Sequence, residues 1–134
     1  MTVQAKRDQE VRVVVVDDNP DFAQIISELL VMAGYRVETV WDAHEAFDLI
    51  DRFSPHCVVL DCVMPGVDGH EFASTLRTRY GGKLMLVAVS GLDVNSSRVS
   101  TTLEFVDHYL HKPVEYDRLT QILPEVSVAR FNAW

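Results

Sequence analysis

The chain has 134 residues, 48% of them hydrophobic and 24% charged, and 12 basic residues against 20 acidic ones give a formal net charge of −8. A chain of this length buries roughly two-thirds of its unfolded surface, which is enough for one folded core but not for two enzyme-sized domains. The hydrophobic content excludes a disordered chain. The negative balance argues against general binding to nucleic acid or to an anionic membrane, because phosphates would be repelled.

The N-terminal residues and the cysteines predict a cytoplasmic protein without membrane insertion. Residues 1–10 are polar and lack the apolar core of a signal peptide, so we expect a flexible N-terminal segment. The longest uninterrupted apolar run covers only residues 84–89, whereas a transmembrane helix needs about twenty residues. Cys57 and Cys62 are too few for a disulfide framework and are interpreted as buried free thiols.

The first two elements are clear from their patterns. Residues 11–16 read VRVVVV, a continuous run typical of a strand buried on both faces of a parallel sheet. Asn19 and Pro20 then supply a helix cap and a favoured first helical residue. The helix that follows is predicted to end at Gly34. Its inward stripe has helical spacing and consists of Phe22, Ile25, Ile26, Leu29, Leu30 and Ala33.

Strands and helices continue to alternate up to residue 123. Asp42 can cap a second helix, Pro55 ends it, and Gly81-Gly82 ends the third. The serines and threonines of 94–105 predict only a poor fourth helix, because their hydroxyls compete for backbone hydrogen bonds. The other expected elements are strands at 36–41 (near an edge), 57–60, 84–89 and 108–111, a loop at 64–69, a helix carrying Phe72, Ala73 and Leu76, and a last helix at 115–123.

Five β-α units predict an α/β fold, with a doubly wound parallel sheet and helices on both faces. We expect one domain over residues 11–123. Residues 124–134 form a short C-terminal tail, too short for an output domain. The apolar side chains of this tail could dock on the domain or belong to a loose terminus: Val126, Val128, Phe131 and Trp134.

Polar side chains stand at four of the five strand ends. Asp17-Asp18 follows the first strand, Asp61 the third, Ser90 the fourth and Lys112 the fifth. Ligands of open parallel sheets bind beyond the carboxyl ends of the strands. We therefore expect these side chains to converge in one site.

Three neighbouring carboxylates stay ionised together only when a cation joins them. An all-oxygen ligand set suits Mg²⁺, with Mn²⁺ as the alternative, rather than zinc. A carboxylate beside such a cation, with Lys112 and the Ser90 hydroxyl nearby, can act as a nucleophile toward a phosphoryl group. Lys112 would neutralise transferred charge, and Ser90 would bind a phosphoryl oxygen.

These motifs resemble the receiver domains of two-component response regulators. The resemblance covers residues 11–123 and implies a flavodoxin-like fold with five helices and the strand order 2-1-3-4-5. It is carried by Asp17-Asp18 after VVVV, Asp61 in LDCVMPGVDG, Ser90 in VAVSG and Lys112-Pro113 in YLHKPV.

The resemblance implies a role for each matching residue around the acceptor. Asp61 would accept the phosphoryl group. Asp18 would bind Mg²⁺ directly and Asp17 largely through water, while the backbone carbonyl of Val63 would be a further ligand. Apolar Val63 and Leu92 stand two residues after Asp61 and Ser90, where family members tune water access. We therefore hypothesise a long-lived phosphorylated state.

The resemblance also implies a switch and its partners. Ser90 would move toward the phosphoryl group, Tyr109 would turn inward after it, and the bond before Pro113 would be cis. The donor would be a sensor histidine kinase or a histidine phosphotransfer protein, and the output partner is unknown; a dimer formed on phosphorylation is left open. Family members often have glycine before the fifth strand, where this chain has Phe105, so that helix should end by another geometry.

Several functions remain as alternatives to a stand-alone phosphorylation switch that is not an enzyme. The chain could be a receiver fragment of a hybrid histidine kinase or of a multidomain regulator. An aspartate-nucleophile phosphohydrolase is less favoured, because that class needs a second aspartate where Val63 stands. A flavin-binding module is disfavoured because Asp17 and Asp18 would repel a phosphate after the first strand.

Overall fold

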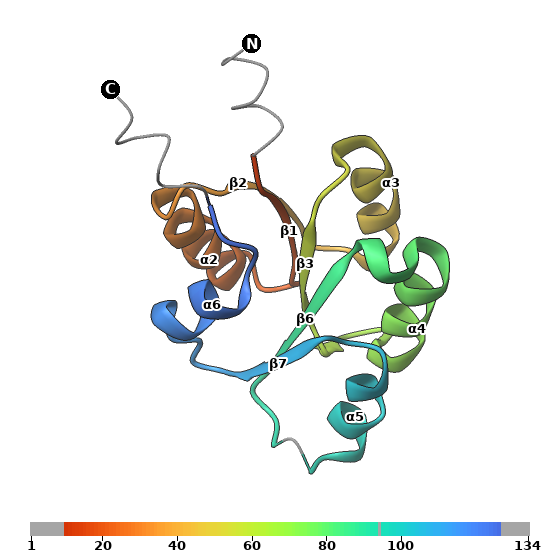
Figure 1. Ribbon diagram of the computed structural model, residues 1–134. Helices are drawn as coiled ribbons and strands as arrows, with labels where there is room; N and C mark the ends of the chain where they lie inside the picture. The colour runs from red at the N-terminus through yellow and green to blue at the C-terminus, as the bar shows by residue number, and fades with distance from the viewer. Residues whose placement is uncertain (1–9, 94, 127–134) are drawn as a thin grey trace, which may run out of the picture.

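A five-stranded parallel sheet forms the centre of the computed structural model, which describes residues 10–93 and 95–126 (Figure 1). The order β2-β1-β3-β6-β7 corresponds to 2-1-3-4-5 among the sheet strands and confirms the predicted flavodoxin-like topology. The five strands are β1 (Arg12–Val16), β2 (Arg36–Val40), β3 (Cys57–Asp61), β6 (Met85–Ser90) and β7 (His108–His111).

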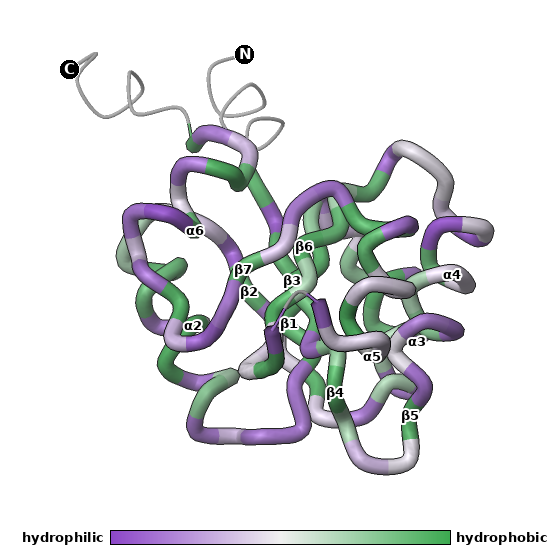
Figure 2. Tube along the Cα trace, turned by 90° about the horizontal axis from the view of Figure 1, so that it is seen from below, coloured by the Kyte–Doolittle hydropathy of each residue, from purple (hydrophilic) through white to green (hydrophobic). Residues whose placement is uncertain are grey.

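Helices cover both faces of this sheet. Figure 1 shows α2 (Pro20–Met32) and α6 (Tyr116–Ile122) on one side. On the other side lie α3 (Ala43–Phe53), α4 (Gly69–Tyr80) and the short α5 (Ser97–Ser100). The view from the carboxyl ends of the strands shows hydrophobic strands between helices with hydrophilic outer residues (Figure 2).

The β1 strand shows why this sequence forms a layered structure. Successive side chains of a strand point to opposite faces. Val13 and Val15 accordingly join the core under α2 and α6, whereas Val14 and Val16 join the core under α3 and α4. All four valines are at most 1% exposed, so the sheet needs helices on both faces to keep β1 out of water.

Three of the helices begin with a side-chain cap, and two of these caps, Asn19 and Asp42, were predicted from the sequence. The Asn19 side chain accepts hydrogen bonds from the N–H groups of Asp21 and Phe22 at the start of α2. Asp42 accepts from His44 at the start of α3, as the sequence predicted. Asp68, at the start of α4, is a capping residue as well.

The segment after Asp61 is more ordered than the predicted loop. Residues 63–68 form a small antiparallel hairpin of β4 (Val63–Met64) and β5 (Val67–Asp68), so a plain loop at 64–69 was wrong. The turn formers that suggested a loop lie at the hairpin tip, where Gly66 has a φ of 73°. The hairpin is followed at once by Gly69, where a Cβ would collide with the carbonyl oxygen of Cys62.

The predicted helix over 94–105 is also corrected. The described part contains one turn of α-helix, α5, and a 3₁₀ helix (Thr102–Glu104). The Thr101 hydroxyl donates to the Ser97 carbonyl at 3.1 Å, the kind of local bond that weakens a regular helix. Phe105 ends the 3₁₀ helix with a φ of −107°, so no left-handed residue is needed there.

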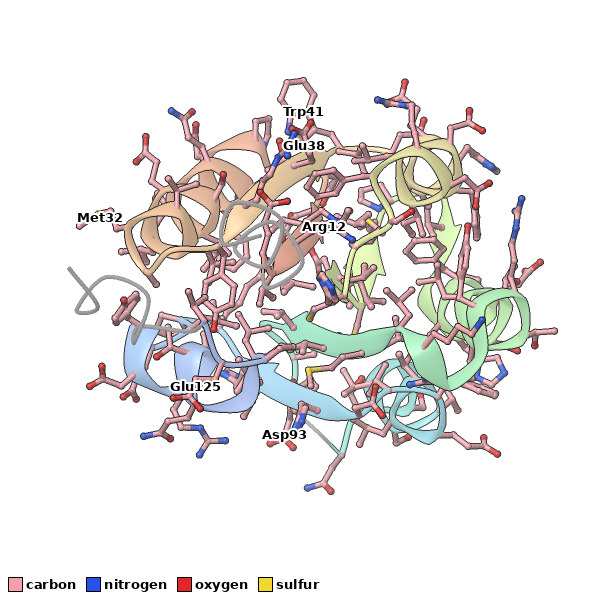
Figure 3. All side chains as sticks on the ribbon, turned by 45° about the horizontal axis from the view of Figure 1, so that its top comes forward. Arg12, Met32, Glu38, Trp41, Asp93 and Glu125 are labelled. Carbon is pink, nitrogen blue, oxygen red and sulfur yellow. The ribbon has the colours of Figure 1, made fainter. Side chains whose placement is uncertain are left out.

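Some apolar residues lie outside the core that the sequence pattern predicted. Ile25 belongs to the expected inward stripe of α2 but is 56% exposed, because the sheet covers a narrower arc of the helix than the stripe spans. Met32 and Trp41 project outward and are 82% and 58% exposed (Figure 3). Strand β2 ends at Val40, one residue earlier than predicted.

The start of the C-terminal tail docks on the domain. Val126 is buried and packs against Gly34, and the Tyr35 hydroxyl donates to the Pro124 carbonyl at 2.8 Å. The other apolar tail residues, and nearly all of the predicted flexible N-terminal segment, lie outside the described residues. Among the helices that are described, each is too short or too polar to span a bilayer.

Candidate functional site

The carboxyl edge of the sheet brings together the residues that the sequence placed at four strand ends. Asp61 is the last residue of β3, and Ser90 is the last residue of β6. Asp17 directly follows β1 and donates its N–H to the Val40 carbonyl at 3.1 Å. Lys112 follows β7 and donates its N–H to the Ser90 carbonyl at 2.8 Å. Parallel pairing therefore aligns all these side chains at one edge.

Three carboxylates form a cluster at this edge. One carboxylate oxygen from each of Asp17, Asp18 and Asp61 lies within 4.8 Å of the other two. Asp17 is 1% exposed and Asp61 is 6% exposed, whereas Asp18 faces solvent. Two buried carboxylates and one open one give a site that a hydrated cation can reach from outside.

Lys112 holds the two buried carboxylates. Its Nζ lies 3.2 Å from Asp17 Oδ2 and 3.4 Å from Asp61 Oδ2. The same Nζ lies 4.1 Å from the centre of the Phe22 ring. One ammonium group thus partly offsets the charge of the cluster and leaves a net negative site.

The pKa of Asp61 lies above its ordinary value of 3.8. Burial is the largest cause, because it penalises the charged carboxylate. The Val63 N–H, which donates to Asp61 Oδ1 at 3.0 Å, works against it, the Asp17 charge adds to it, and Lys112 opposes it. At Asp61, burial and the charge of Asp17 therefore outweigh the lowering effects of the Val63 N–H and of Lys112 on the pKa.

This donor set fits a hard divalent cation. All three side chains offer carboxylate oxygens, and the pairing of the two buried ones with Lys112 still leaves negative charge to balance. Mg²⁺ usually binds to one or two carboxylates and keeps several waters, which suits a cluster with one exposed member. The described residues thus contain an acidic pocket whose donors suit Mg²⁺.

Ser90 and Tyr109 meet at the loop that follows β6. Ser90 is fully buried, and its Oγ accepts a hydrogen bond from the Leu92 N–H at 2.9 Å. The Tyr109 hydroxyl donates to the Leu92 carbonyl at 2.7 Å. A movement of this loop would therefore change the hydrogen bonds of both side chains. The peptide bond between Lys112 and Pro113 is cis.

Two contacts at the site were not foreseen from the sequence. Phe22 was assigned only to the core of α2, yet its ring touches the Lys112 ammonium. Its position in the first turn of the helix that follows Asp17-Asp18 is a signal that could have indicated it. The sequence analysis gave Val63 roles through its carbonyl and its apolar side chain, but did not foresee that its N–H donates to Asp61 Oδ1.

The response regulator receiver domain family matches residues 13–124 of this chain. The response regulator MprA of Mycolicibacterium vanbaalenii is 38% identical over 109 residues, which make up 81% of this chain and 47% of that protein. The MprA of Mycobacterium bovis is 36% identical over a stretch of the same length. The chain therefore spans about half the length of the curated relatives it matches.

Solved structures agree with the family match. A CheY-like receiver domain from Methylobacillus flagellatus has a TM-score of 0.75 at 26% identity, over 84% of this chain and 95% of that one. A signal receiver domain from Bermanella marisrubri has a TM-score of 0.75 at 29% identity, over 84% and 93%. The chain belongs to the response regulator receiver domain family of two-component signalling.

Proposed function

We propose that this protein is a phosphorylation-dependent switch in which Asp61 accepts a phosphoryl group in a Mg²⁺-dependent reaction. The observation that carries the proposal is the cluster at the sheet edge, where the Asp61 carboxylate lies beside those of Asp17 and Asp18 and 3.4 Å from Lys112 Nζ. A carboxylate in a cluster of three that has one ammonium group as its basic partner is suited to an incoming cation and an incoming phosphoryl group. Within this proposal the protein is a regulatory acceptor and not an enzyme with turnover.

The transfer step needs only a nucleophile and charge neutralisation from this chain. One oxygen of the Asp61 carboxylate attacks phosphorus, while the bond from phosphorus to the donor histidine nitrogen breaks. The electron pair of that bond leaves with the imidazole, which takes up a proton. The Lys112 ammonium stands beside Asp61 Oδ2 and neutralises charge on the phosphoryl oxygens.

Asp17, Asp18 and Asp61 are the side chains that would hold Mg²⁺, with the Val63 carbonyl as a proposed fourth ligand from the chain. The bound cation supplies positive charge that offsets the phosphoryl oxygens. Lys112 then has to share Asp17 and Asp61 with the cation. Mn²⁺ suits the same ligands.

The switch is proposed to run through Ser90 and Tyr109. Ser90 gives up the hydrogen bond of its Oγ with Leu92 and binds a phosphoryl oxygen instead. Because Tyr109 of β7 donates to the carbonyl of the same Leu92, a shift of this loop would reach the face formed by α5, β7 and α6. That face is where we propose that an output partner binds, or that a second copy docks on phosphorylation.

The proposed donor is a sensor histidine kinase or a histidine phosphotransfer protein, with an output partner or an onward relay receiving the signal. The alternative is a receiver segment within a hybrid kinase or a multidomain regulator. The proposed compartment is the cytoplasm, where the free thiols Cys57 and Cys62 would stay reduced.

Apolar side chains flank the acceptor and predict a slow loss of the phosphoryl group. Val63 is half-buried two residues after Asp61, and Leu92 is an exposed apolar residue two positions after Ser90. Neither side chain can orient an attacking water by hydrogen bonding. A phosphorylated form that decays within seconds in Mg²⁺ buffer would contradict this part of the proposal.

Intact mass after incubation with acetyl phosphate and Mg²⁺ tests the proposal. We expect a gain of one phosphoryl group that is absent in Asp61→Asn and absent when EDTA replaces Mg²⁺. Steady turnover of phosphate esters without a phosphorylated intermediate would instead favour a hydrolase. No gain of mass with Mg²⁺ present would overturn the switch.

A further inference from the structure

The ring of Phe22 is in direct contact with the ammonium group of Lys112. Phe22 is the third residue of α2, and its ring centre lies 4.1 Å from Lys112 Nζ. The ring is half-buried and packs against the core under α2 and α6, so its position is fixed by its neighbours. The face of an aromatic ring attracts a cation, and the attraction strengthens when water is excluded.

The carboxylates and the ring differ in how long they can hold Lys112. Asp17 and Asp61 are the proposed ligands of a cation, and Asp61 is the proposed acceptor, so both change partners during the reaction. The Phe22 ring is neither a metal ligand nor an acceptor, and its contact with Lys112 can persist throughout. This matters because a lysine ammonium sits on a flexible four-carbon stem, and the Lys112 side chain is 25% exposed.

We propose that Phe22 is a positioning residue that holds the Lys112 ammonium over Asp61 during phosphoryl transfer. This inference rests on the proposed function of Asp61 and adds a residue of α2 to it. Charge that is in place before the reaction stabilises the transferred group better than charge that must be brought in. Loss of the ring would leave Lys112 present but less often correctly placed.

Proton NMR of the metal-free protein tests the contact without any phosphoryl transfer. The ε-methylene protons of Lys112 should be shifted upfield by the Phe22 ring. Phe22→Leu should remove the shift, whereas Phe22→Tyr, which keeps an aromatic face, should retain it. An unshifted Lys112 signal in the wild type, or one that is unchanged in Phe22→Leu, would overturn the proposal.

The rate of phosphorylation by acetyl phosphate with Mg²⁺ tests the consequence. Phe22→Leu should be slower by about 3- to 10-fold, the range expected from losing a partly desolvated cation–π contact. Phe22→Tyr should restore most of the rate. A leucine variant as fast as the wild type, or a tyrosine variant as slow as the leucine variant, would contradict the positioning role.

Phe53→Leu is the matched control. Phe53 is also half-buried with a cation over its ring, the Arg36 guanidinium carbon at 5.6 Å. It lies at the far end of the strands, where its carbonyl accepts a hydrogen bond from Arg12 at the start of β1. This variant should keep the wild-type rate. A wild type that is not phosphorylated at all would refute the proposed function itself, which a defect confined to Phe22→Leu cannot do.

Discussion

Asp61 and Asp107 are aspartates that each accept a backbone N–H and contact a basic side chain, yet their pKa values move in opposite directions. Asp61 accepts from Val63 and lies near Lys112. Asp107 accepts from the Leu86 N–H and forms an ion pair with Arg77, both at 2.8 Å. Burial tends to raise both, and the pKa of Asp61 does rise. At Asp107 the hydrogen bonds and the charge of Arg77 outweigh burial and lower the pKa.

The difference lies in what surrounds each carboxylate. Asp61 is deeper, its cation is shared with Asp17, and the Lys112 contact is longer, at 3.4 Å. Among the described acidic groups, Asp107 alone forms an ion pair with Arg77. The Arg77 guanidinium also donates to three carbonyls, those of Phe105, Gly81 and Leu84. The pair at Asp107 therefore serves the fold, whereas Asp61 remains open to a further partner.

The largest expected effect comes from removing the cation at the Asp61 site. Lys112→Met should slow phosphorylation by acetyl phosphate by about 100-fold, because no other basic side chain of the described residues forms an ion pair with Asp61. The measurement is the initial rate of mass gain with saturating Mg²⁺. Arg77→Met should leave this rate unchanged, because Arg77 pairs with Asp107 and not with Asp61. A Lys112→Met rate within a few-fold of the wild type would mean that Asp61 does not depend on its lysine.

Breaking the second pair should affect stability instead. Arg77→Met should lower the free energy of unfolding by about 2 kcal/mol, because Asp107 and the carbonyls lose a partly buried charged donor. Urea denaturation measures this, and the fraction phosphorylated should match that of the wild type. A loss of phosphorylation with unchanged stability would show that Arg77 serves the Asp61 site and not the fold.

The smallest expected effects are changes in how folding stability depends on pH, measured in metal-free buffer. The raised pKa of Asp61 means that its contribution to stability is present below its ordinary value of 3.8 and is lost as pH rises through the folded-state pKa. Asp61→Asn should therefore stabilise the protein near neutral pH, and the gain should vanish toward low pH.

Asp107→Asn should show the opposite sign. The lowered pKa of Asp107 stabilises the fold above 3.8, and this contribution disappears as pH falls through the folded-state pKa. The substitution should cost about 1 kcal/mol or less near neutral pH, since Asp107 is partly screened by solvent, and the cost should shrink in acid. Both variants remove one negative charge, so each controls for net charge. If urea denaturation showed changes in the free energy of unfolding of the same sign for the two variants near neutral pH, the opposite pKa directions of Asp61 and Asp107 would be contradicted.

The sequence predicted the acidic site better than it predicted the supporting structure. β-Branched runs define strands, and parallel pairing then brings their polar end residues together whatever the details of the helices. Asp17, Asp61, Ser90 and Lys112 could be placed for this reason. The pairing of Arg77 with Asp107 joins residues thirty positions apart with no periodic pattern, so only tertiary structure reveals it.

Local competition explains the elements that were missed. The hairpin of β4 and β5 is built from the same turn formers that a loop would use. The fourth predicted helix is shortened because hydroxyls such as that of Thr101 bond to the backbone, and the balance depends on packing. The outward position of Ile25 depends on how far the sheet extends beneath α2, which periodicity does not encode.

Locating the phosphoryl group shows whether Asp61 is the acceptor. The protein is incubated with acetyl phosphate and Mg²⁺, reduced with borohydride, which converts an aspartyl phosphate to homoserine, and digested for peptide mass analysis. We expect homoserine at position 61 and none at positions 17, 18 or 107. Modification at any of those other aspartates, or a phosphorylated protein with Asp61 unmodified, would contradict it.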